Sequence, residues 1–240
     1  MIENIDLTAS IIVDDYSIDE KRIRPVHGLS IYIEAYNNVI LFDTGPDASI
    51  LQENSEALGV DLSLVDTVVI SHIHTDHIGG IPHIGWVSPA VKTYIPYASG
   101  QQIENYIKKH GLVPVEVMDW LRISNNIVIS KSFYGPPWEH VLIIRTGKGL
   151  VLFTGCAHKG ILSIIEEITS YLDDEVYAIV GGLHLDKAPY HIITNTLEEL
   201  VKKVKYIVPL HCSGNLTRTI LLQKYPDKLI KAFAGSIVNL

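Results

Sequence analysis

Apolar and polar residues follow two different patterns in the two halves of this chain. In the first half, short apolar runs lie between turn residues, and Leu29–Ala35 and Val39–Asp43 predict a hairpin across Asn37-Asn38. In the second half, helical periodicity alternates with apolar runs that are typical of buried strands. The expected strands are Ser10–Val13, Leu29–Ala35, Val39–Asp43, Thr67–Ile70, Lys92–Ile95, Val113–Val117, Ile127–Ser130, Val141–Arg145, Leu150–Thr154, Val176–Val180, Tyr206–Leu210 and Ala232–Val238. The expected helices are Ala48–Leu58, Gln101–His110, Ile161–Leu172, Ile192–Val204 and Leu216–Tyr225.

Hairpins followed by βα units favour two mixed sheets covered by helices on their outer faces. This arrangement is an α/β fold of the four-layer α/β/β/α sandwich type. With 240 residues and 47% hydrophobic residues, the chain is long enough to bury a large core. We therefore expect residues 1–240 to form one domain.

A dense group of metal-ligand residues follows the predicted strand Thr67–Ile70. His72 and His74 are two residues apart, so an extended backbone places both imidazoles on one side, where they can hold one cation. Asp76 and His77 come after the chain has begun to turn and can face a second cation. This spacing is typical of two-metal sites, with ions ~3.5–4 Å apart. Imidazole and carboxylate ligands favour two divalent ions, with zinc preferred and iron, manganese and nickel as alternatives.

These residues also carry a family resemblance. His-x-His-x-Asp-His after an apolar strand looks like the signature of the metallo-β-lactamase superfamily. Three further segments resemble the other landmark strands of that superfamily in the same order: Val39–Gly45, Gly149–Gly155 and Ile207–His211. The resemblance extends from about residue 28 to the end of the chain. It implies the same four-layer fold, with metals at one edge between the sheets.

The resemblance also implies roles for single residues. His211 resembles a ligand of the Asp76/His77 metal, and His158 is the expected remaining imidazole of the His72/His74 metal. The counterpart of Asp43 orients the metal loop by hydrogen bonding. Most members have a bridging aspartate where this chain has Cys156, so Cys156 is either a thiolate ligand or a pocket-lining residue. His140 is the candidate for an earlier family histidine, with packing in the core as the alternative.

Four blocks resemble one subgroup, the 7,8-dihydropterin-6-yl-methyl-4-(β-D-ribofuranosyl)aminobenzene 5′-phosphate synthases. They are His27–Ser30, Cys156–Gly160, Gly181–His184 and Pro209–Gly214. We expect His27 and His184 to line the site, with His184 acting either as a donor to substrate or as an extra metal ligand. Asp76 is expected to orient a reactive water and accept its proton. Lys159 and Arg218 are the candidate phosphate contacts.

Composition narrows the choice of function. The formal net charge of −8 and the scattered Lys and Arg residues argue against nucleic acid as a partner. The start has no charged-then-apolar leader and no window reaches about 18 apolar residues, which favours a cytoplasmic protein without membrane contact. Only Cys156 and Cys212 occur, each near a candidate histidine, so a disulfide framework is not expected.

The leading hypothesis is a dinuclear metal-dependent hydrolase, or a phosphate-ester or pyrophosphate-releasing transferase, acting on a small anionic metabolite. A dihydropterin-linked substrate is implied by the subgroup resemblance. The alternatives are a non-heme metal redox enzyme acting on a thiol or oxygen, and a non-catalytic metal-bearing sensor. The oligomeric state stays open, with a homo-oligomer among the alternatives.

Overall fold

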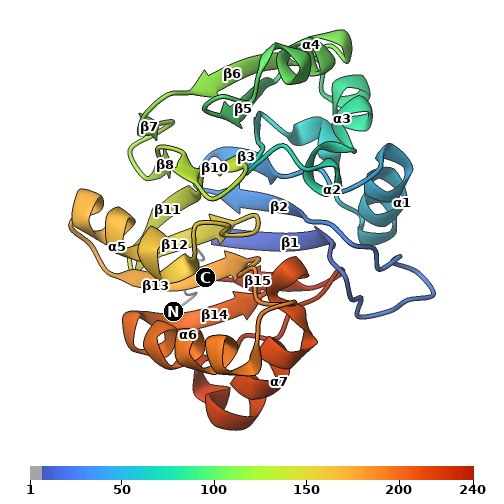
Figure 1. The fold of residues 1–240 in the computed structure, drawn as a ribbon. Helices are drawn as coiled ribbons and strands as arrows, with labels where there is room; N and C mark the ends of the chain where they lie inside the picture. The colour runs from blue at the N-terminus through green and yellow to red at the C-terminus, as the bar shows by residue number, and fades with distance from the viewer. Residues whose placement is uncertain (1–6) are drawn as a thin grey trace.

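Two β-sheets face each other in the computed structural model, which describes residues 7–240 (Figure 1). The first sheet has the strand order β15-β1-β2-β3-β4-β5-β6, and the second has the order β14-β13-β12-β11-β8-β7. The first is built from β1 (Leu7–Val13), β2 (Ser30–Ala35), β3 (Asn38–Phe42), β4 (Thr67–Val69), β5 (Lys92–Pro96), β6 (Val113–Val117) and β15 (Ile237–Asn239). The second is built from β7 (Leu121–Arg122), β8 (Ile127–Ile129), β11 (Leu142–Thr146), β12 (Gly149–Thr154), β13 (Val176–Gly181) and β14 (Val204–Pro209). The small hairpin of β9 (Phe133–Tyr134) and β10 (Trp138–Glu139) stands apart.

The inner faces of the two sheets form the central core. Phe42 of β3 and Phe153 of β12 are fully buried, and their ring centroids lie 6.1 Å apart across the interface. Alternate residues on the strands point outward and form two further apolar clusters beneath the helices. Three apolar layers therefore hold four layers of secondary structure together.

Helices cover the two outer faces (Figure 1). Apolar residues of α1 (Ala48–Leu58), α2 (Thr75–Ile78), α3 (Ile81–Val87) and α4 (Gln101–Lys109) pack with the first sheet. Those of α5 (Ile161–Leu172), α6 (Tyr190–Lys203) and α7 (Gly214–Lys224) pack with the second. Short 3-10 helices lie at Leu62–Leu64, His211–Ser213 and Pro226–Lys228. The expected four-layer α/β/β/α sandwich is confirmed. Among residues 7–240, no helix combines the length and apolarity needed to cross a membrane.

Strand direction explains where polar side chains gather. Strands β3 to β6 are parallel to one another, as are β12 to β14. Strand β1 runs in the same direction as β3, because both are antiparallel to β2. The segments that follow β1, β3, β4, β12, β13 and β14 meet at one edge between the sheets. Ligands of open α/β sheets commonly bind beyond such carboxyl ends.

Two expectations about elements are wrong in detail. The last strand covers only Ile237–Asn239, not Ala232–Val238, because Gly235 adopts φ 97° and Ala234 makes an isolated bridge to Ser17. The helix Ile81–Val87 was not expected, since glycine and proline interrupt its sequence. Pro82 is tolerated because it lies in the first turn, where its missing N–H has no partner in the helix.

Candidate metal centre

The first group of imidazoles combines the loop after β4 with the turn after β12. His72 Nε2 lies 2.9 Å from His74 Nδ1, and the His158 ring centroid lies 4.6 Å from that of His72. His72 Nδ1 donates to Ser71 Oγ at 3.0 Å, and His158 Nδ1 donates to Glu139 Oε2 at 2.8 Å. The structure therefore brings His72, His74 and His158 together from both sheets.

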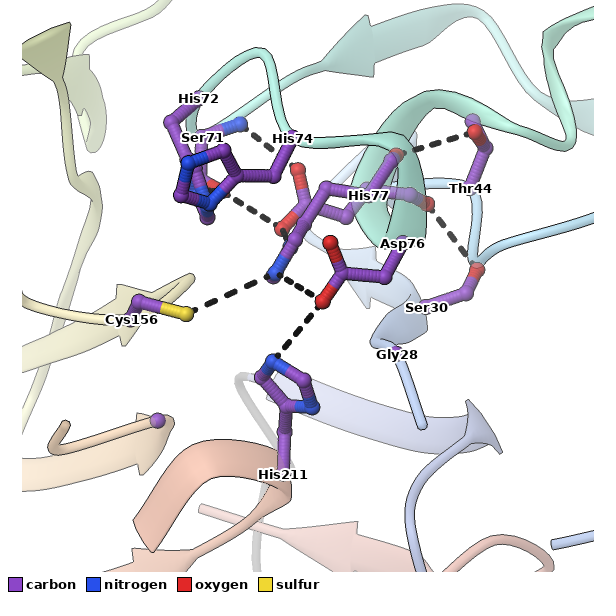
Figure 2. A network of polar contacts seen from close by, with 12 residues as sticks. Gly28, Ser30, Thr44, Ser71, His72, His74, Asp76, His77, Cys156 and His211 are labelled. Carbon is purple, nitrogen blue, oxygen red and sulfur yellow. Dashed lines mark hydrogen bonds and ion pairs between the residues drawn. The ribbon is translucent and has the colours of Figure 1, made fainter. Parts of the chain in front are cut away.

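The second group joins α2 to the turn after β14 (Figure 2). Asp76 Oδ2 lies 3.5 Å from His77 Nε2 and 3.3 Å from His211 Nε2. His77 Nδ1 donates to Asp43 Oδ2 at 2.7 Å, and His211 Nδ1 donates to Asp15 Oδ1 at 2.9 Å. Asp43 also accepts from the Ser71 N–H and hydroxyl, each at 2.7 Å, so one buried carboxylate fixes the loop that bears these ligands.

The hydrogen bonds select the metal-binding tautomer. Because Nδ1 of His72, His77, His158 and His211 donates to an oxygen, Nε2 is the nitrogen of each ring that can bind a cation. Such outer partners are the usual way in which a protein orients imidazole ligands. Four ligands at the typical Zn–N distance stand about 3.3 Å apart in a tetrahedron. The separations of 2.9 to 3.5 Å between facing ligand atoms match this value, so the residues present fit a bound cation.

Cys156 lies between the two groups. Its Sγ is 3.6 Å from His77 Nε2, and the thiol points toward that ring in Figure 2. Cys156 forms one compact donor set with His72 and His158 and another with His77 and His211, all within 4.8 Å. A sulfur donor in this position can contact ions in either group.

Glu139, which sequence reasoning did not select, builds the turn that carries Cys156 and His158. Its buried carboxylate accepts from the N–H groups of Cys156, Ala157 and His158 at 2.8, 2.8 and 2.9 Å. Burial alone would raise the pKa of Glu139, but the hydrogen bond from His158 and the nearby imidazoles lower it well below its usual range. The only sequence signal was an acidic residue next to a histidine, directly before the predicted strand Val141–Arg145.

Asp14 and Asp15 were missed as well. Both follow β1, where Asp14 accepts the His211 N–H at 2.5 Å. The Asp15 carboxylate accepts hydrogen bonds from Nδ1 of both His211 and His27, at 2.9 and 3.0 Å. Two acids directly after a buried strand were the available signal.

The backbone is strained at several positions around the centre. Asp43, Ala157, His184 and His211 adopt φ values of 57°, 60°, 54° and 45°. Such conformations cost about 1–3 kcal/mol each for residues other than glycine and persist where surrounding contacts hold them. Gly155 is required for a different reason, because a Cβ there would stand 2.0 Å from Ser71 Oγ.

A cavity of about 430 Å³ opens over the ligands. Its lining is His27, His74, Asp76, Cys156, His158, His184, Asp186, Lys187, Ala188, His211 and Cys212. His27 and His184 thus lie at the cavity, as expected from the sequence. Lys187, which the sequence analysis did not select, also lies at the wall of the cavity.

Three expected residues lie elsewhere. Lys159 pairs with Glu167 and stands over the Phe133 ring, so it is not a phosphate contact in this cavity. Arg218 donates to Asp14 and packs over the Tyr16 ring, outside the cavity. His140 is fully buried and joins neither donor set, and burial lowers its pKa to about 3.

Burial and pairing set the charge of the ligands before a metal binds. Burial and the nearby His211 lower the pKa of His77 to about 3, so that ring is neutral. Burial raises the pKa of Asp43 to about 7. Burial by itself would lower the pKa of His211, but the hydrogen bonds to Asp15 and Asp76 raise it to about 10. Burial would raise the pKa of Asp76, yet the hydrogen bond from His211 and the charge of that ring lower it, so Asp76 is ionised.

Two proteins of Methanocaldococcus jannaschii are similar to this chain. The 7,8-dihydropterin-6-methyl-4-(beta-D-ribofuranosyl)-aminobenzene-5'-phosphate synthase is 26% identical, and the match covers 99% of this chain and 97% of that protein. An uncharacterized protein, MJ0448, is 24% identical over 92% of this chain and 96% of its own length.

Solved structures share the fold. Tm1679, a metal-dependent hydrolase of the beta-lactamase superfamily, superposes with a TM-score of 0.83 at 23% identity, covering 98% of this chain and 99% of that one. The metallo-beta-lactamase fold protein YhfI from Bacillus subtilis gives a TM-score of 0.71 at 13% identity, covering 97% and 99%.

A family model decides the assignment. The model described as the metallo-beta-lactamase superfamily matches residues 23–206, which is most of the chain and contains all of the predicted ligands except His211. The resemblance found in the sequence is therefore confirmed, and this chain belongs to the metallo-beta-lactamase superfamily.

Proposed function

We propose that this chain is a binuclear metal-dependent enzyme that breaks a phosphoester or pyrophosphate bond of a small anionic metabolite. The observation that carries the proposal is the set of four imidazoles whose Nδ1 atoms are held by oxygen acceptors, leaving Nε2 free for metal. His72, His74 and His158 would hold one ion, and Asp76, His77 and His211 would hold the other. Cys156 is placed to contact both.

When bound, two divalent cations would lower the pKa of a shared water to about 7 and polarise a phosphoryl oxygen. Asp76 supplies the basic group, because its lowered pKa keeps the carboxylate ionised and its side chain is 21% exposed to the cavity. It is placed to orient a nucleophile and accept a proton.

The cavity wall supplies the groups that would act on an anionic substrate. The hydrogen bond with Cys212 raises the pKa of His184, which favours the protonated ring at the exposed side of the cavity. His184 can then donate a proton to a departing oxygen. The ammonium group of Lys187 attracts a phosphate to the same wall.

The similar synthase supports a transferase form of the same chemistry. Its name describes a dihydropterin joined through a methyl group to an aminobenzene that carries a ribofuranosyl phosphate. In the proposed reaction the arylamine displaces pyrophosphate from an activated dihydropterin, so one C–N bond forms as one C–O bond breaks. The amine proton passes to Asp76 and the leaving group departs as pyrophosphate.

The test is turnover by metal-replete protein. The panel holds a phosphodiester, a phosphomonoester, a lactone, and a dihydropterin pyrophosphate with the matching arylamine phosphate. We expect Asp76→Asn to lower kcat about 10²–10⁴-fold, and His74→Ala to remove one ion and nearly all turnover. His191→Ala, an exposed histidine on α6, is the matched control. Bound ions without turnover of any panel member would refute the proposal and favour a sensor.

A further inference from the structure

Two polar side chains at the cavity have no part in the proposed pair of ions. Cys212 follows the ligand His211, and His184 follows β13. The Cys212 carbonyl accepts the N–H groups of Leu185 and Asp186, each at 3.0 Å. The segment that bears His184 is therefore fixed directly against Cys212.

These two residues meet Cys156 in one cluster. The two Sγ atoms and a ring nitrogen of His184 all lie within 4.8 Å of one another. Cys156 follows β12, His184 follows β13 and Cys212 follows β14, so each donor comes from a different turn. Both thiols are buried, while His184 is exposed, and all three residues line the cavity. An ion from solvent can therefore reach the cluster from the His184 side.

We propose that Cys156, His184 and Cys212 form a third cation position, distinct from the two positions above, that accepts a soft or borderline ion such as Zn²⁺, Cd²⁺ or Cu⁺. Two sulfurs and one imidazole are the donors that such ions prefer over Mg²⁺ or Ca²⁺. Three protein ligands leave the fourth position open toward the cavity.

The local packing makes room for the sulfur. A Cβ on Gly182 would stand 2.6 Å from Cys212 Sγ, closer than real contacts allow. In a tetrahedral zinc site with Zn–S bonds of about 2.3 Å, two sulfurs stand about 3.8 Å apart. The donor atoms of the cluster lie within 4.8 Å of one another. Side-chain movements that shorten these separations by about 1 Å would bring the sulfurs to the distance of a zinc site.

Sharing of Cys156 links the third position to the proposed pair. Cys156 Sγ lies 3.6 Å from His77 Nε2, so the same sulfur faces both sites. An ion held by Cys212 and His184 competes for this sulfur. The expected consequence is inhibition by an excess of a soft ion.

The test uses Co²⁺ and Cd²⁺ as probes on metal-free, fully reduced protein, after both free thiols have been counted. Thiolates bound to Co²⁺ give a sulfur-to-metal charge-transfer absorption, and the number of bound ions is measured by elemental analysis. We expect Cys212→Ser to lose one ion and roughly half of this absorption while it keeps the ions held by the imidazole groups. His184→Ala should weaken the last-filled ion by more than about tenfold. His191→Ala is again the matched control.

Neither readout depends on turnover, so failure of the proposed reaction leaves this test intact. His74→Ala, which weakens the proposed pair, should retain the absorption due to Cys212. If Cys212→Ser and His184→Ala both bind as many ions as the unaltered protein, with equal absorption, the third position does not exist. His184→Ala decides the matter if Cys212→Ser does not fold, since the exposed ring contributes little to the core.

Discussion

At the scale of single residues, four imidazoles of the proposed centre each donate a hydrogen bond from Nδ1, which turns Nε2 toward the ions. Ser71, Asp43, Glu139 and Asp15 each hold a different ring. None of these four needs to touch an ion. Their contribution is to fix the tautomer and direction of a ligand, so that a cation meets nitrogens already in place.

Glu139→Gln tests this role. Four donors converge on the Glu139 carboxylate, whereas an amide offers one oxygen and places an NH₂ donor against another donor. We expect the affinity for the cation held by His72, His74 and His158 to fall about 10–100-fold. Competition with a chromophoric chelator measures this affinity. Glu199→Gln, on an exposed face of α6, should change nothing. Unchanged affinity in Glu139→Gln would show that the turn holds its shape without the charge.

The raised pKa of His211 predicts a pH dependence. A cation must displace the proton from this ring, so its affinity should increase with pH by about tenfold per unit below the pKa of about 10. Asp15→Asn removes an acceptor that raises this pKa and should flatten the upper part of the curve. Isothermal titration across pH measures both effects, with Asp19→Asn, another acid of the same loop, as the control.

The raised pKa of His211 also predicts how the stability of the metal-free protein depends on pH. The folded-state pKa of His211, about 10, lies above its unfolded value of 6.5. Its contribution to the free energy of unfolding is therefore complete below pH 6.5 and is lost as the pH increases toward about 10. Urea unfolding of metal-free protein at several pH values should show this loss, and a smaller one in Asp15→Asn.

At the scale of elements, the caps of helix α1 stabilise the fold, whereas the segments after the strands supply the residues of the candidate site. Asp47 caps the start of helix α1, and its carboxylate accepts from the N–H groups of Ser49 and Ile50 at 2.7 and 3.3 Å. Gly59 ends the helix in the left-handed conformation at φ 69°. This helix supports the first sheet and contributes no residue to the cavity lining.

Asp47→Ala should therefore lower stability without changing metal binding. Loss of such an N-cap costs about 1 kcal/mol in the free energy of unfolding. Chemical denaturation measures the loss, and Gln52→Ala on the exposed face of the same helix serves as the control. A change in metal affinity would mean that α1 influences the loop after β4.

At the scale of the whole molecule, the proposed ions join the two sheets. His72, His74, Asp76 and His77 follow β4 of the first sheet, whereas Cys156, His158 and His211 follow strands of the second. A cation that binds only the folded state adds about 4 kcal/mol to the free energy of unfolding at 1,000 times its Kd. Because its ligands span both sheets, this gain belongs to the entire sandwich.

Removal of metal should accordingly lower the midpoint of global unfolding. We expect a chelator to shift the denaturant midpoint measured by fluorescence and by circular dichroism to the same extent. His77→Ala should reduce that shift, because it removes one ligand of the second group. Identical midpoints with and without chelator would indicate that the ions do not connect the sheets.

The sequence alone determined most strands, most helices and the loop from His72 to His77. These features depend on local periodicity and on ligands close together in the chain, which a linear pattern records. The strand-end positions of His158, His184 and His211 were visible for the same reason, since apolar runs precede them.

Only the tertiary structure decided the partners of those ligands. His211 meets Asp14 and Asp15 across 197 and 196 residues, and His158 meets Glu139 across 19. It also assigned Lys159 to Glu167 and Arg218 to Asp14, away from the cavity that Lys187 lines. A charged side chain can pair with any opposite charge within reach, and only the packing of two sheets fixes which one is near.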